Sequence, residues 1–134
     1  MNKIIMLLLG LSTLLSCTNN DDSSTDQIIG EWKLIRTTCC FFEGGKTTDY
    51  ANENIIYNFQ PNGMLIVSGG QNVEYPNGQY NYFFGKDYLG GGTSEPKTLL
   101  VKINNNKWTY NLTEGIMTLG MSYVDGPDLH FERK

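Results

Sequence analysis

Apolar and polar residues alternate along most of the chain after Gly30, which is the pattern of strands that bury one face. No long stretch repeats apolar residues with the helical period, and Gly-, Asn- and Pro-containing turns separate the alternating stretches. Eight such stretches occur, at 30–38, 54–59, 64–67, 78–85, 97–103, 107–112, 116–122 and 128–134. We therefore expect an all-β domain over residues 30–134, an up-and-down antiparallel meander of about eight strands.

The alternation also assigns side chains to faces. In the first stretch Trp32, Leu34 and Arg36 share a face, and in the last stretch His130 points away from the face of its apolar neighbours, so we expect an exposed surface histidine. Two connections, 39–53 and 85–97, are longer than hairpin turns, and we expect loops there.

One face of the meander is rich in aromatic residues. The meander is expected to close into a barrel, because closure removes unpaired sheet edges, with an open sandwich as the alternative. Aromatic side chains with polar atoms can line a site for a small apolar or amphipathic ligand, reached through a mouth framed by the two long connections. Alternatively they fill the core, since an eight-stranded barrel is just wide enough for its own side chains. The candidate binding residues are Tyr57, Phe59, Tyr80, Tyr82, Trp108 and Tyr110.

The first 16 residues have the features of a secretory signal peptide: Lys3 is followed by an apolar run too short to be a permanent membrane span. The run ends in Leu14-Leu15-Ser16-Cys17, which resembles the lipobox of bacterial lipoproteins. That resemblance implies diacylglycerol on the Cys17 thiol and an acyl chain such as palmitate on its amine. The alternative is an ordinary signal peptide with an incidental cysteine.

The following segment, 17–29, contains "TNNDDSSTD", is polar, and is expected to be a disordered tether. Thr18 after the cysteine argues against retention in the inner membrane. The expected location is thus the outer membrane of a Gram-negative bacterium, with the barrel lipid-anchored on either the periplasmic or the outer surface. Removal of residues 1–16 takes away Lys3 and no acidic residue, so the formal charge goes from −4 to −5. This charge disfavours nucleic acid as a partner.

The chain offers little for catalysis. It contains a single histidine and no paired carboxylates at an evident spacing, so we expect no enzyme, catalytic residue, cofactor or metal site. Cys39 and Cys40 are adjacent, and a bridge between them requires a turn-like backbone. We favour two unbridged small residues there and keep a vicinal disulfide as the alternative.

Gly30-Glu31-Trp32 at the start of the first strand resembles the opening motif of lipocalins. In that family the Trp closes one end of the barrel and an Arg near the end of the last strand packs over its indole, a role that falls to Arg133. "YNFQPNGML", "GQYNY" and "KWTYNLTEGIMTL" are also similar to small lipocalin-like domains of bacterial lipoproteins. The chain departs from full lipocalins in being shorter and in lacking a second lipocalin motif.

Two functions remain open on this basis. The first is a membrane-anchored lipocalin-like protein that binds a small apolar or amphipathic ligand inside the barrel. The second is a non-enzymatic interaction lipoprotein with a filled barrel whose loops bind an envelope protein, a glycan or a host factor. Exposed Phe41 and Phe42 side chains in the first long connection would favour the second function, and a large interior void would favour the first.

Overall fold

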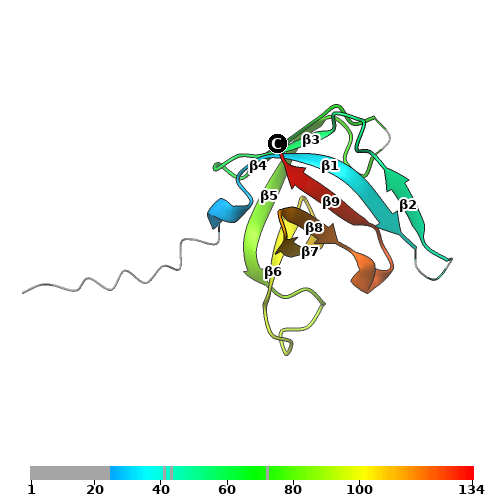
Figure 1. Ribbon diagram of the computed structural model, residues 1–134. Helices are drawn as coiled ribbons and strands as arrows, with labels where there is room; N and C mark the ends of the chain where they lie inside the picture. The colour runs from blue at the N-terminus through cyan, green and yellow to red at the C-terminus, as the bar shows by residue number, and fades with distance from the viewer. Residues whose placement is uncertain (1–24, 41, 43, 72) are drawn as a thin grey trace, which may run out of the picture.

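Antiparallel strands form an eight-stranded, closed, up-and-down β-barrel, as expected (Figure 1). A computed structural model describes residues 25–40, 42, 44–71 and 73–134; the predicted signal peptide and Cys17 lie outside these residues. The strands are β1 (Gly30–Cys39), β2 (Lys46–Asp49), β3 (Ile56–Phe59), β4 (Met64–Ser68), β5 (Gly78–Asp87), β6 (Thr98–Ile103), β7 (Asn106–Thr113), β8 (Ile116–Gly120) and β9 (Asp128–Arg133). The 3-10 turns η1 (Thr25–Gln27) and η3 (Ser122–Val124) accompany them, and no helix of the described residues is long and apolar enough to cross a membrane.

The first and last strands close the barrel. β9 pairs with β1 from Trp32 opposite Arg133 to Thr38 opposite Asp128, while β3 and β2 pair with residues 30–33 and 36–39 of β1. Since β9 occupies one edge of β1 along this length, β2 and β3 lie in line along the other edge and together count as one strand, so the nine strands make an eight-stranded barrel. The short strand β2 was not expected from the sequence, because its "KTTD" has no apolar alternation to reveal it.

The face predicted for Arg36 is wrong because β1 contains an irregularity. Leu34 is opposite Phe131 and Arg36 is opposite His130. Two steps along β1 therefore match one step along β9, and Ile35 is the extra residue of a bulge. The bulge shifts the alternation by one position. Trp32 and Leu34 are therefore buried in the interior, whereas Arg36 is exposed.

Up-and-down connectivity places successive connections at alternating ends of the barrel. The β1–β2 hairpin and the β4–β5, β6–β7 and β8–β9 connections share one end, here called the upper end. The first described residues, the C-terminus and the β3–β4, β5–β6 and β7–β8 connections are at the other, lower end. The two long connections thus start from opposite ends of the barrel, which differs from the shared mouth expected from the sequence. Residues 89–91 of the second connection nevertheless line a hollow of about 460 Å³ with residues 105–107, 121 and 123–124 of upper-end connections.

The lower end is closed by Trp32, which is 1% exposed. Its Nε1 donates a hydrogen bond to the carbonyl oxygen of Ile28 at 2.8 Å, and the Arg133 guanidinium carbon lies 4.1 Å from the indole centroid. Arg133 also donates to the Gln27 carbonyl at 3.0 Å. Ile28 is fully buried, so the tether expected to extend to residue 29 ends earlier.

Replacing Arg133 with methionine is expected to lower the free energy of unfolding by about 1 kcal/mol, through loss of the cation–π contact and of the hydrogen bonds to the Gln27 and Ile29 carbonyls. Urea unfolding followed by circular dichroism measures the loss. Lys134→Met is the control, because the Lys134 ammonium makes only an exposed ion pair, 3.8 Å from a Glu31 carboxylate oxygen. Equal losses in the two variants would contradict the role given to Arg133.

Candidate functional site in the barrel interior

The six aromatic residues predicted to line a site all belong to the interior core cluster. Tyr57, Phe59 and Trp108 are fully buried, whereas Tyr80, Tyr82 and Tyr110 are partly buried and pack against the cluster. They come from β3, β5 and β7, whose alternating positions point inward. The structure therefore brings the predicted residues together, and their ligand binding stays a prediction.

The rings contact each other edge to face and fill much of the interior. Toward the lower end, Phe59 and Tyr82 lie 5.0 Å apart between ring centroids, and Phe84 and Tyr110 lie 4.7 Å apart. Higher in the barrel, the rings of Tyr57 and Phe131 are 4.8 Å apart. Such contacts stabilise the fold and leave the lower half of the barrel occupied by strand side chains.

The upper half is filled differently, because a residue from a connection enters it. Tyr75 belongs to the β4–β5 connection, is only 5% exposed, and places its ring among the rings of three strand residues. The centroid distances are 6.3 Å to Tyr57, 5.1 Å to Tyr80 and 6.0 Å to Trp108. Sequence reasoning missed Tyr75 since it lies outside every alternating stretch. The available signal was a single aromatic residue in the turn-rich segment "GGQNVEYPNG".

The Tyr75 hydroxyl is the polar centre of this region. It accepts hydrogen bonds from Trp108 Nε1 at 2.9 Å and from Asn106 Nδ2 at 3.4 Å. Burial raises the pKa of Tyr75, so the phenol is neutral at physiological pH. The connection is held at its base by a hydrogen bond from the Gly70 backbone N–H to Asn77 Oδ1 at 2.8 Å, and the Tyr80 hydroxyl donates to the Pro76 carbonyl at 2.6 Å.

Two other interior hydroxyls, those of Tyr57 and Tyr110, are buried with no hydrogen-bond partner among the described residues. Burial raises the pKa of Tyr57 above its usual range, and the neighbouring Tyr75 phenol raises it further. The Tyr75 backbone N–H, which falls short of hydrogen-bond geometry to the Tyr57 oxygen, partly offsets the rise. A buried hydroxyl without a partner costs free energy, so it is uncommon in a region that serves packing alone. Because Tyr110 lies toward the lower end, such hydroxyls occur at both levels of the barrel, and the Tyr75 ring, which comes from a connection, is what distinguishes the upper interior as the candidate site.

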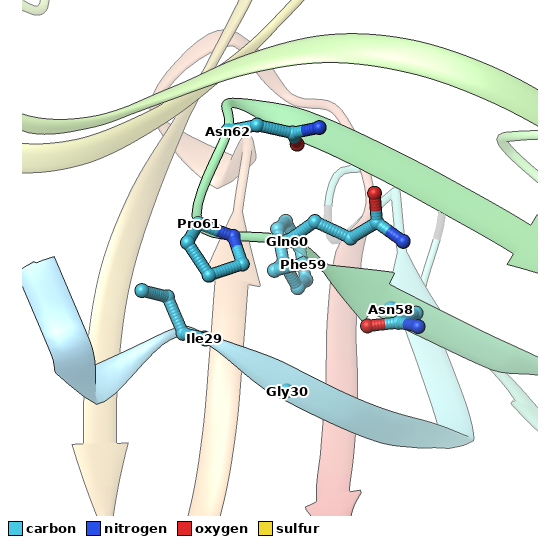
Figure 2. A pocket seen from close by; sticks show the side chains of 7 residues that line it. All are labelled: Ile29, Gly30, Asn58, Phe59, Gln60, Pro61 and Asn62. Atoms are coloured by element: carbon cyan, nitrogen blue, oxygen red, sulfur yellow. The ribbon is translucent and has the colours of Figure 1, made fainter.

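Open hollows lie elsewhere on the barrel. Figure 2 shows one of about 460 Å³ between the start of β1 and the β3–β4 turn, with Ile29 near Pro61 and the amides of Asn58 and Gln60 farther along. A neighbouring hollow of about 240 Å³ shares Ile29 and Pro61. Both are open at the lower end, and neither contains Tyr57, Trp108 or another upper aromatic residue.

The tip of the β1–β2 hairpin projects from the upper end. Cys39 and Cys40 form a vicinal disulfide, with their Cα atoms 3.7 Å apart, so the preference for unbridged cysteines is wrong. Cys40 adopts a left-handed φ of 64°, which supplies the turn-like backbone that the bridge requires. Phe42, two residues on, is 89% exposed, whereas Phe41 lies outside the described residues.

His130 lies on the outer face, as expected from the alternation, but it is half-buried rather than freely exposed. Its Nε2 is 3.1 Å from Thr38 Oγ1 and its Nδ1 is 3.1 Å from Thr118 Oγ1. Burial lowers the pKa of His130 and the nearby Arg36 lowers it further, against a smaller opposing effect of Asp128. The arrangement holds a neutral imidazole between two hydroxyls.

This lowered pKa predicts a small acid sensitivity. The unfolded chain takes up the His130 proton at a higher pH than the folded chain does, so stability is present above the unfolded pKa, about 6.5, and is lost as pH falls below it. Solvent screening limits the loss to about 0.5 kcal/mol. Urea unfolding at pH 7.5 and 5.5 should show a larger drop in wild type than in His130→Gln; equal drops would contradict the assignment.

Among the described residues, no group of three His, Cys, Asp or Glu side chains is placed to hold a metal ion. Comparisons of the chain with protein-family models, with curated proteins and with solved structures gave no match.

Proposed function

We propose that this protein is a membrane-anchored, lipocalin-like binding protein that takes a small apolar or amphipathic ligand into the upper interior of its barrel. The observation that carries the proposal is the origin of Tyr75: the side chain that fills the upper interior comes from a connection and not from a strand. A connection can move without loss of strand pairing, whereas a strand side chain cannot leave the interior unless the barrel opens.

The lower end supports the lipocalin-like assignment. Trp32 beneath the Arg133 guanidinium closes this end in the way that the Gly-x-Trp resemblance implies. A ligand would then enter at the upper end, where the β4–β5 connection lies over Tyr57 and Trp108. The lipobox-like segment ending at Cys17 would attach the barrel to the outer membrane, with the acidic tether as a spacer.

Native mass spectrometry of the protein purified gently from its host envelope tests this function. A retained small molecule, or uptake of an apolar fluorescent dye that a lipid extract displaces, is expected. A mass without a bound molecule, together with no dye uptake and no thermal shift across a panel of lipids and aromatic compounds, would overturn internal binding.

A second function, contact with an envelope protein, glycan or host factor, is favoured by Phe42. A highly exposed aromatic ring in a hairpin turn is a typical contact anchor, and the nearby disulfide joins the two residues that begin the turn. A photo-crosslinking amino acid at position 42 should give one discrete adduct in the host envelope. The control is the same amino acid at position 83, where Phe83 is 48% exposed on the barrel wall. The same adducts from both positions would reject this function.

A further inference from the structure

The environment of the Tyr75 ring describes what the upper interior can hold. Aromatic rings contact it from β3, β5 and β7, with interplanar angles of 80° to Tyr57, 71° to Tyr80 and 59° to Trp108. The contacts with Tyr57 and Tyr80 are edge to face and the Trp108 ring is tilted, an arrangement that favours a flat aromatic ring over a bulky aliphatic group. The walls of this space thus select for a planar molecule.

The polar atoms around the same ring specify its substituent. Trp108 Nε1 is a donor only, is buried, and points at the Tyr75 oxygen from 2.9 Å. If Tyr75 left without a replacement, the indole N–H would lose its acceptor in an apolar region, which costs free energy. An occupant of this position therefore needs an oxygen acceptor at the place of the Tyr75 hydroxyl.

The charge of the occupant is also restricted. No charged side chain is buried among the residues that the structure describes, so nothing in the interior would compensate an ionised ligand. The Tyr57 hydroxyl, which lies beside Tyr75 without a partner, adds a neutral donor. A neutral aromatic molecule with a hydroxyl group meets all of these conditions, and a fatty acid does not.

We propose that the Tyr75 side chain acts as an internal occupant of the ligand site, and that the external ligand is a neutral planar aromatic compound whose hydroxyl group replaces that of Tyr75. The proposal rests on the proposed function and names its ligand class. Binding requires the β4–β5 connection to withdraw Tyr75, so the residue competes with the ligand and lowers its apparent affinity.

The test removes the internal occupant and supplies its chemical equivalent. Titration calorimetry and thermal shift are measured on wild type and Tyr75→Ala with p-cresol, which matches the tyrosine side chain, and with toluene, which lacks the hydroxyl. We expect Tyr75→Ala to bind p-cresol at least ~10-fold more tightly than toluene, from one hydrogen bond to a buried donor. Wild type should bind p-cresol at least ~10-fold more weakly than Tyr75→Ala does.

A matched variant separates the hydrogen bond from the cavity. Tyr75→Ala combined with Trp108→Phe keeps an aromatic wall but removes the indole donor, and its preference for p-cresol over toluene should fall to about twofold or less. Should Tyr75→Ala fail to fold, the indole N–H resonance of Trp108 is followed in wild type by NMR. There, p-cresol must shift the resonance and toluene must shift it less.

The outcomes separate the ligand class and the competition by Tyr75 from binding in the barrel interior. Equal affinities for p-cresol and toluene, or equal p-cresol affinities of wild type and Tyr75→Ala, would overturn the ligand class or the internal competition while leaving interior binding in place. If neither compound binds folded Tyr75→Ala and neither shifts the Trp108 resonance in wild type, the ligand class is overturned, and the proposed function is overturned with it when native mass spectrometry and dye uptake are also negative.

Discussion

Replacing Gly69 with alanine is expected to lower the free energy of unfolding by about 3 kcal/mol and to loosen the connection that carries Tyr75. Gly69 follows β4 with a φ of +75°, a region that costs other residues about 1 kcal/mol or more. A Cβ there would lie 1.9 Å from the Asn54 carbonyl oxygen, so backbone must move. The substitution would push apart two backbone segments, the start of the β4–β5 connection and the segment before β3.

The chain supplies a control for the backbone conformation. Gly115, in the β7–β8 turn, has a φ of +78°, and a Cβ built on it meets nothing within 4 Å. Gly115→Ala should thus show only the conformational cost, about 1 kcal/mol. Urea unfolding measures both variants, and acrylamide quenching of tryptophan fluorescence should increase in folded Gly69→Ala as Trp108 becomes accessible. Equal losses in the two variants, or unchanged quenching in Gly69→Ala, would contradict the close contact at Asn54.

Much of the barrel could be predicted from the sequence because its strands are half-buried. Side chains of the β7 stretch alternate, those of β5 and β6 alternate over part of their length, and the turns between strands carry Gly, Asn or Pro, so most strand positions and the closed meander were correctly predicted. The Trp32–Arg133 contact was also predicted, although these residues are about a hundred positions apart, because the resemblance to lipocalins named both positions. Pattern alone would not have paired them.

The remaining features depend on tertiary structure, which periodicity does not encode. The bulge at Ile35 inserts one residue into a regular alternation, and this insertion moved Arg36 to the outer face. The disulfide depends on the left-handed backbone of Cys40. Tyr75 enters the barrel from a connection whose composition is that of a loop. The part of the candidate site contributed by strands was thus predictable, and the residue that covers it was not.

Replacing Tyr57 with phenylalanine is expected to stabilise the protein, by about 1–2 kcal/mol, because it removes a buried hydroxyl that has no hydrogen-bond partner among the described residues and keeps the ring in place. The ring contacts with Phe131, at 4.8 Å, and with Tyr75, at 6.3 Å, would remain. Urea unfolding of the apo protein measures the change. Tyr82→Phe is the control with the opposite sign, because the Tyr82 hydroxyl donates to the Gln60 carbonyl.

The same substitution relates stability to function. A hydroxyl that lowers stability persists where it serves a ligand, so Tyr57→Phe should raise the free energy of unfolding. The double variant Tyr57→Phe/Tyr75→Ala should also bind a phenol with a second acceptor group, such as methyl 4-hydroxybenzoate, about fivefold more weakly than Tyr75→Ala alone does. Affinity for p-cresol, which has no second acceptor, should change less. If Tyr57→Phe destabilises the protein as Tyr82→Phe does, the Tyr57 hydroxyl has a structural partner in the folded chain and is not held free for a ligand.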